Sequence, residues 1–278
     1  MIIDFHTHIF GQAVRDERAK YIHDDPLFSE LYSSPKATLA SAEDLIASMD
    51  EFSIDRSVVL NIAWSSSALC HETNQYLLEA AARYPRRLTA FGMVRLDDPH
   101  AALAEIEILA GGGARGIGEI RPDVSWLQNP ELVRPVIQAI ADRRLLLLTH
   151  ASEPIGHQYQ GKGCVTPQSL YGFLCAFPDL PIVCAHWGGG LPFYALMPEV
   201  RKSLQNVYFD SAASSYLYQP AVFRLVAALG GADKILFGTD FPVLKQGRLL
   251  KEIDSQPWAA GERDQFLAGN ALRLLGLA

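Results

Sequence analysis

Six residues stand out among the histidines and carboxylates of the sequence as candidates to bind a divalent metal ion, and they are spread over most of the chain. Two form a His-x-His pair close to the first residue, and the whole set is His6, His8, Glu119, His150, His186 and Asp240. Imidazole nitrogens and carboxylate oxygens are the usual ligands of zinc and similar ions. Each residue alone also has a plain structural explanation, as a buried histidine or a turn carboxylate. The set is therefore informative only if the fold brings its members together.

The elements that must position these residues alternate along the chain. Eight apolar runs have the length of strands: 2–5, 57–62, 88–94, 114–119, 145–150, 181–186, 207–210 and 234–237. Several, such as 145–148, are almost continuously apolar, which is typical of parallel strands buried on both faces. Helical stretches separate the runs: one capped at Ser41, then 74–84, 99–110, 130–142, 167–177, 191–203, 220–229 and 263–275. This alternation predicts an α/β fold, a single (β/α)8 TIM barrel, with an open doubly wound sheet as the alternative.

A barrel would place the six residues at one end. His6 and His8 follow the first predicted strand, and the other four lie at or just past the ends of the fourth, fifth, sixth and eighth strands. Active sites of such barrels form at the C-terminal ends of the strands. Residues i and i+2 of a strand point to the same side, so both histidines of the pair can face the barrel mouth. The sequence therefore predicts a site there for a divalent metal, with zinc expected and one or two ions left open.

Composition and charge limit the number of domains, the binding partners and the cellular location to be expected. No linker or internal repeat divides the chain, so residues 1–278 are expected to form one domain. The net charge of −7 gives no long-range attraction for nucleic acid or anionic membranes. No apolar run reaches the roughly 18 residues of a membrane span. The four cysteines lack metal-ligand spacing and suggest a reducing, cytoplasmic location. Two long connections, 11–36 and 151–166, are expected to be functional loops, and a homodimer is left open.

Four segments carry a family resemblance. Residues 1–8 (MIIDFHTH), 185–190 (AHWGGG), 236–242 (LFGTDFP) and 269–277 (GNALRLLGL) resemble the signature segments of the amidohydrolase superfamily. The most similar branch is the amidohydrolase-related group that includes aminocarboxymuconate semialdehyde decarboxylase and small-molecule hydrolases. The resemblance spans nearly the whole chain. It implies a (β/α)8 barrel, a divalent metal that is commonly zinc, and either hydrolysis or non-oxidative decarboxylation.

The resemblance also implies roles for single residues. By position, the metal ligands of the family correspond to His6, His8, His150 and Asp240. His186 corresponds to a histidine that binds a second metal in some branches and acts as a catalytic acid or base in others. Glu119 stands where one branch has a carbamylated lysine. The segment 116–120 (GIGEI) is similar to TatD-type hydrolases, in which this glutamate can bridge two metals.

Glu119 favours hydrolysis of an ester, lactone or amide over the alternatives. In that hypothesis Asp240 is the general base and His186 or the metal stabilises the oxyanion. The alternatives are decarboxylation of an unsaturated or aromatic acid, with His186 and Asp240 handling the proton, a hydratase, and a non-catalytic barrel. The substrate is expected to be a small molecule that carries a carboxylate.

Three residues near the predicted mouth are candidates for contact with that substrate. Arg121 and Arg95 could bind a carboxylate in bidentate fashion, although a salt bridge at the barrel rim is an equal alternative. Trp187 could line the pocket, although packing explains a buried aromatic residue as well.

Overall fold

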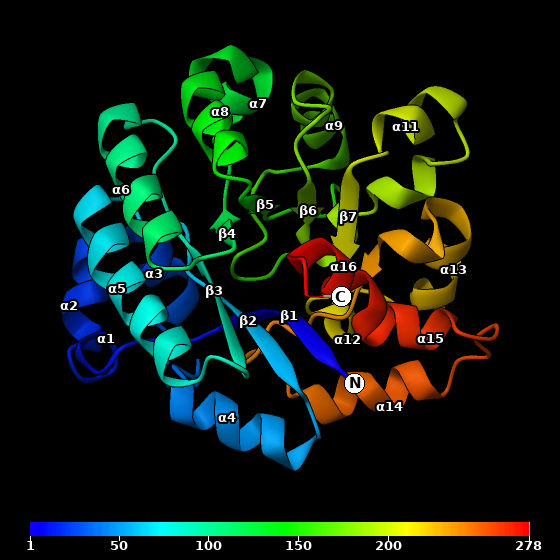
Figure 1. Cartoon of the computed structure of the whole chain (residues 1–278), viewed down its shortest axis with the longest axis horizontal. Helices are drawn as coiled ribbons and strands as arrows, with labels where there is room; N and C mark the ends of the chain where they lie inside the picture. Colours follow the sequence, from blue (N-terminus) through cyan, green and yellow to red (C-terminus); the bar gives the residue numbers. More distant parts are fainter. Residues whose placement is uncertain (278) are drawn as a thin grey trace.

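The computed structural model describes residues 1–277, and its centre is one parallel sheet (Figure 1). Within the described residues the sheet has eight strands in chain order: β1 (Ile3–His8), β2 (Arg56–Leu60), β3 (Leu88–Gly92), β4 (Gly116–Ile120), β5 (Leu146–Thr149), β6 (Ile182–Cys184), β7 (Val207–Asp210) and β8 (Ile235–Leu236). Every neighbouring pair is parallel. This order confirms the predicted α/β class and excludes the doubly wound alternative, in which the strand order reverses.

The two edges of the sheet meet, which closes the barrel. The Phe5 amide donates to the carbonyl of Phe237 at 2.7 Å, and Thr7 forms a parallel bridge with Phe241. The buried Asp4 carboxylate adds two hydrogen bonds across the same seam, from the amide of Thr239 at 2.9 Å and from its hydroxyl at 2.6 Å. The fold is therefore the predicted (β/α)8 TIM barrel.

Helices surround the strands (Figure 1). Their bounds are α1 (Gln12–Asp16), α2 (Arg18–Asp24), α3 (Pro26–Tyr32), α4 (Ala42–Glu51), α5 (Ser67–Arg83), α6 (Pro99–Gly111), α7 (Val124–Gln128), α8 (Arg134–Asp142), α9 (Pro167–Ala176), α10 (Ala185–Gly188), α11 (Pro198–Ser203), α12 (Ser214–Leu217), α13 (Val222–Gly230), α14 (Gln246–Asp254), α15 (Glu262–Asp264) and α16 (Asn270–Leu275). Short 3₁₀ helices occupy Pro130–Val133, Leu191–Tyr194 and Ala232–Lys234, and a π-helix occupies Gln265–Gly269. None of the described helices is long and apolar enough to cross a membrane.

The hydrophobic core has an inner and an outer layer. Side chains from the strands, among them Phe5, Phe91 and Leu148, fill the barrel together with Ala271 and Leu275 of α16. A larger cluster packs the outer faces of the strands against the helices. The filled interior makes the barrel a rigid support, so the open end at the C-termini of the strands is where ligands can enter.

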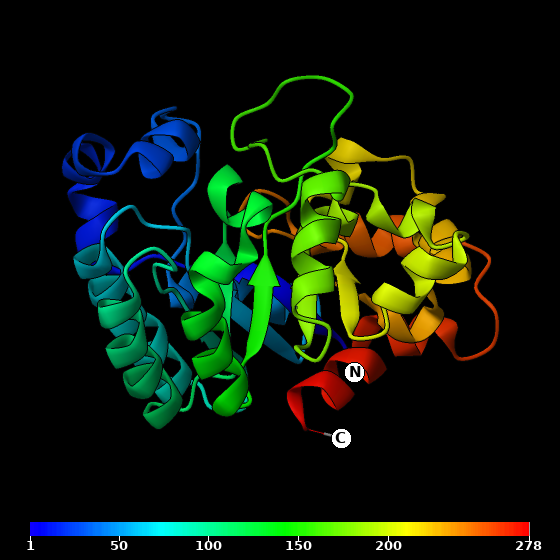
Figure 2. The ribbon, with the colours of Figure 1, turned by 90° about the horizontal axis from the view of Figure 1, so that it is seen from above.

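The two long connections, 11–36 and 151–166, differ in secondary structure. The segment 11–36 was expected to be a loop, but it contains α1, α2 and α3. The Asp25 side chain caps α3 by accepting from the Phe28 amide at 2.7 Å, and Pro26 suits its first turn. Phe28 then stacks on Trp64 after β2, which holds the segment down. The connection 151–166 has neither helix nor strand, as expected, and Figure 2 shows it arching outwards as a long green loop.

Candidate active site

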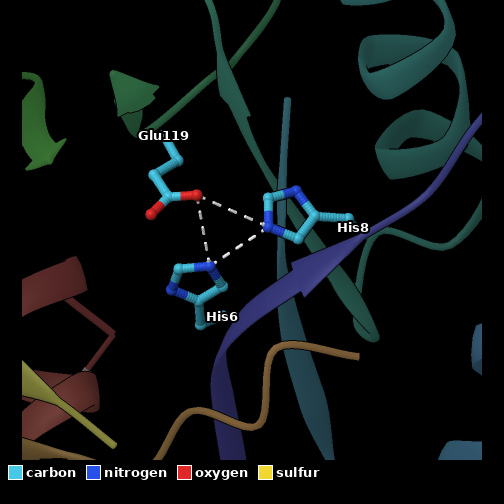
Figure 3. A group of neighbouring side chains, drawn as sticks. All are labelled: His6, His8 and Glu119. Carbon is cyan, nitrogen blue, oxygen red and sulfur yellow. Dashed lines mark hydrogen bonds and ion pairs between the residues drawn. The ribbon is translucent and has the colours of Figure 1, made fainter. Parts of the chain in front are cut away.

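The His-x-His pair of β1 lies at the barrel mouth with two carboxylates around it. The Nε2 atoms of His6 and His8 are 3.1 Å apart. One oxygen of Glu119, at the end of β4, is 3.7 Å from each of them (Figure 3). An oxygen of Asp240 is 3.7 Å from His6 and 3.4 Å from His8. A register shift in β1 between Asp4 and Thr7 accompanies this arrangement, and such bulges re-aim side chains beside active sites.

Glu119 also faces a second group of histidines. Its other oxygen lies 3.0 Å from Nδ1 of His150 and 3.5 Å from Nε2 of His186. The structure therefore brings all six predicted residues into one cluster, with Glu119 between two groups of potential ligands. The position of His186 depends on an unusual backbone, since its φ of 54° is left-handed, as is the φ of 67° at Asp240. Strain of this kind costs about 1–3 kcal/mol per residue and concentrates at functional sites.

A seventh residue, Asp210 at the end of β7, contacts His6 and His186 of the cluster. Its fully buried carboxylate lies 2.9 Å from Nδ1 of His6 and accepts hydrogen bonds from the amides of His186 and Ala212. With Nδ1 donating to Asp210, the Nε2 atom of His6 is free to bind a metal. Sequence reasoning missed this role. The available signal was a carboxylate at the end of a predicted strand, in line with the ends of the other strands.

The carboxylates give the cluster a strongly negative potential. Burial lowers the pKa of His6, but the charges of Asp210 and Glu119 outweigh burial and raise that pKa to about 10. Burial likewise lowers the pKa of His186, and Glu119 raises it to a net value of about 9. Burial raises the pKa of Glu119, and the neighbouring imidazoles, His6 first, hold it well below its usual range. A cluster that stabilises imidazolium charges can hold a divalent cation in place of those protons.

The donor set fits a divalent metal ion. Ligand atoms of His6, His8 and Glu119 lie within 4.8 Å of one another, and so do those of Glu119, His150 and His186. Asp240 lies beside the first group. Mixed imidazole and carboxylate ligands suit zinc, manganese and iron alike, so the geometry supports the class of ion rather than one element.

We expect Asp210→Asn to weaken metal binding about 10- to 100-fold, which is the usual cost of losing a carboxylate that orients a ligating histidine. Calorimetric titration of Mn²⁺ into chelator-treated protein measures the dissociation constant directly. Asp16→Asn, an exposed change in α1, is the control. A metal affinity equal to that of the wild type would show that Asp210 serves the fold alone.

A cavity of about 340 Å³ opens above the cluster. Its polar lining includes His8, Glu119, His150, His186 and Asp240, together with Arg121 on the wall. The remaining wall is largely aliphatic and aromatic, from Leu27, Leu31, Tyr32, Ile62, Tyr159, Tyr216, Leu217 and Val243. The site therefore combines potential metal ligands, one guanidinium group and an apolar surface, which suits a small, flat, acidic molecule.

Two of the three residues expected to contact substrate, Trp187 and Arg95, do not line this cavity. Trp187 is fully buried, packs against Phe223 and Phe266, and donates its indole hydrogen to Ser214 at 2.7 Å. Its left-handed backbone, with a φ of 57°, turns it into the core and away from the cavity. Arg95 lies in a smaller neighbouring cavity and is held by the Ser65 carbonyl and Asp97. Arg121 is thus the expected arginine that reaches the large cavity.

Residues 3–277 match the sequence model of the amidohydrolase family. The chain belongs to the amidohydrolase family. Membership confirms the predicted superfamily and the prediction that the chain is an enzyme. The likeness of residues 116–120 to TatD-type hydrolases stays a prediction.

Three relatives of this amidohydrolase are decarboxylases of aromatic acids. The 6-methylsalicylic acid decarboxylase of Penicillium expansum is 23% identical over 221 residues, with 67% of each chain covered. The 5-carboxyvanillate decarboxylase of Sphingomonas paucimobilis superposes with a TM-score of 0.82 at 18% identity, covering 100% of this chain and 99% of that one. The dihydroxybenzoic acid decarboxylase of Polaromonas sp. JS666, with bound manganese and 2-nitroresorcinol, superposes with a TM-score of 0.75 at 19% identity, covering 99% and 97%. At these identities the two structures support the shared fold.

Proposed function

We propose that this amidohydrolase is a metal-dependent, non-oxidative decarboxylase of a small aromatic acid. The observation that carries the proposal is the cavity itself, where an apolar wall and Arg121 stand above a cluster of histidines and carboxylates. The relatives that decarboxylate hydroxylated or methylated benzoic acids support the same choice. Hydrolysis is favoured by Glu119 alone, so decarboxylation is the better supported of the two hypotheses.

We assign the metal to His6, His8, His150 and Asp240, with Glu119 and His186 as further candidate ligands. A divalent ion supplies polarisation of a carboxylate or phenol oxygen for decarboxylation, or activation of water for hydrolysis. Manganese replaces zinc as the first ion to test, because the solved decarboxylase of Polaromonas holds manganese. We propose that the whole chain forms one catalytic domain acting on a free small molecule.

Two residues of the chain suit the proton transfers. Burial raises the pKa of Asp240, but its hydrogen bond with His8 and the charges of nearby imidazoles lower it overall, so Asp240 is ionised and can accept the proton of a substrate hydroxyl. When His186 does not bind a metal, the charges of Glu119 and Asp240 favour its protonated form, and it can donate that proton to the ring carbon that bears the carboxylate. The carbon–carbon bond then breaks, carbon dioxide leaves, and the bonding electrons restore the aromatic ring. Asp240 returns the hydroxyl proton, and solvent reprotonates His186.

Arg121 is placed to bind the substrate's carboxylate. We expect Arg121→Met to raise KM for a benzoic acid substrate about 10- to 100-fold, because a charge-assisted hydrogen bond contributes about 1.5–3 kcal/mol. Steady-state kinetics with Arg95→Met as the matched control measure the effect, since Arg95 lies outside the large cavity. Equal KM values for the two variants would remove Arg121 from the site.

The proposal is tested by supplying a panel of hydroxybenzoic acids to the Mn²⁺-loaded protein and measuring released carbon dioxide. Stoichiometric carbon dioxide and a product that has lost one carboxylate are expected for at least one acid. Turnover of esters, lactones or amides with no carbon dioxide release would instead favour hydrolysis. Hydrolysis is the second candidate because Glu119 lies between two groups of histidines, an arrangement with room for two ions.

A further inference from the structure

Two hydrogen bonds at Gly161, one with Arg121 and one with Glu30, hold the loop 151–166 at the cavity. The guanidinium Nη2 of Arg121 donates to the Gly161 carbonyl at 2.7 Å. The Gly161 amide donates to Glu30 of α3 at 2.9 Å, and the same oxygen of Glu30 lies 3.8 Å from Arg121. The peptide of Gly161 therefore joins the loop, the segment of α3 and the end of β4.

Gly163 allows the loop to approach the guanidinium closely. A Cβ atom at Gly163 would lie 2.6 Å from Nη2 and 2.8 Å from Nε of Arg121, so the guanidinium would have to shift to make room for it. Its φ of +64° is also in the left-handed region that favours glycine. The backbone of this turn, rather than a side chain, thus forms the surface against which Arg121 rests.

Lys162 fixes the turn between the two glycines. Its side chain is buried, and its ammonium donates to the carbonyls of His157 at 3.0 Å and Ile155 at 3.3 Å. Its own carbonyl lies 3.2 Å from Nε2 of His150, whose Nδ1 faces Glu119. The turn consequently contacts both Arg121 in the wall of the cavity and His150, one of the proposed metal ligands.

We propose that the turn Gly161–Gly163 is a specificity-determining element that holds Arg121 in position to bind a substrate carboxylate. Among the described residues, the Nη1 atom of Arg121 has no hydrogen-bond partner, and the side chain lines the cavity. A guanidinium that is already held loses less conformational freedom when a carboxylate binds, which increases affinity. This inference rests on the proposed function in one respect, that the ligand is a carboxylate.

The direct test compares Gly163→Ala with Gly156→Ala in the Mn²⁺-loaded protein, with benzoate as the probe. Both glycines lie in the same loop with positive φ, but a Cβ at Gly156 would meet no atom within 4 Å. We expect Gly163→Ala to weaken benzoate binding at least about tenfold, because displacing a positioned group by about 1 Å has effects of this size. Gly156→Ala should leave the affinity within about twofold, as for surface changes. Equal affinities for the two variants would overturn the proposal.

A double-mutant cycle separates positioning from loss of structure. In the Arg121→Met background, Gly163→Ala should have no further effect on benzoate binding, because the group it displaces is already gone. Additive losses would overturn the proposal. If Gly163→Ala fails to fold, Lys162→Met replaces it, with Lys20→Met at an exposed position of α2 as its control, and the same cycle applies.

Benzoate binding also separates this inference from the proposed function. A tenfold difference between the glycine variants, in a protein that releases no carbon dioxide from any hydroxybenzoic acid, would reject decarboxylation and keep the role of the turn. Decarboxylation with equal benzoate affinities in both glycine variants would support the proposed function and reject the role of the turn. A wild-type protein that binds no benzoate at millimolar concentration would also overturn the role of the turn.

Discussion

His8→Ala is expected to leave a folded protein that neither retains a divalent ion nor turns over substrate. His8 lies at the cavity, and its Nε2 is 3.7 Å from an oxygen of Glu119 and 3.4 Å from an oxygen of Asp240. Loss of a ligand removes charge stabilisation of several kcal/mol, which corresponds to a decrease in kcat/KM of about 10³-fold or more. His8 is a better choice than His6, whose removal would leave the buried Asp210 carboxylate without its imidazole partner.

Elemental analysis and steady-state kinetics measure both consequences of His8→Ala. His23→Ala in α2 is the matched control, because that histidine is exposed and lies outside the cluster. Thermal unfolding with and without added Mn²⁺ completes the comparison, since an ion that binds only the folded state raises the unfolding temperature of the wild type. Normal metal content and activity in His8→Ala would exclude the His-x-His pair from the metal site.

Asp240→Asn is the second change with a large expected effect, because it keeps the shape of the side chain and removes its charge. An amide cannot accept a proton from a substrate hydroxyl, and general acid–base catalysis contributes about 10²–10⁴-fold. The charge of Asp240 also raises the pKa of His186, so its removal lowers the fraction of His186 that holds a proton to donate. We expect kcat to fall about 10³-fold.

The kcat of Asp240→Asn is measured at saturating substrate and saturating Mn²⁺, so that weaker binding of either one does not contribute. Asp179→Asn, an exposed change in the turn before β6, is the control. A kcat within tenfold of the wild-type value would show that Asp240 does not take part in proton transfer.

The barrel and its six-residue cluster were predictable from sequence for a simple physical reason. Parallel strands joined by helices end on the same side of a sheet, so residues such as Glu119 and His186 must converge once the strands are recognised. The predicted strand boundaries differed by a few residues, for example 181–186 against Ile182–Cys184. These differences moved no member of the cluster away from the mouth.

Features that depend on packing between distant segments were not predictable in this way. The bond between Asp210 and His6 joins residues 204 positions apart, and no spacing in the sequence indicates it. Trp187 is a candidate for the pocket on sequence, with packing as the alternative, and the structure buries it fully in the core. The helices of 11–36 are only five to seven residues long and depend on packing, such as that of Phe28 on Trp64, more than on periodicity.

The choice between decarboxylation and hydrolysis was also beyond the sequence, because both reactions use the same ligands on the same fold. What separates them is the fate of the carboxylate and of water. Arg121 and the apolar wall of the cavity favour an aromatic acid, and the position of Glu119 between two groups of ligands keeps hydrolysis as the second candidate.

One measurement tests the central claim most directly. Chelator-treated protein, with and without restored Mn²⁺, is incubated with hydroxybenzoic acids in deuterium oxide, and carbon dioxide and the aromatic product are quantified together. The proposed function predicts equal amounts of carbon dioxide and of a product with deuterium on the carbon that carried the carboxylate, only when Mn²⁺ is present. Undiminished product formation without the metal, or no carbon dioxide from any of the acids, would contradict it.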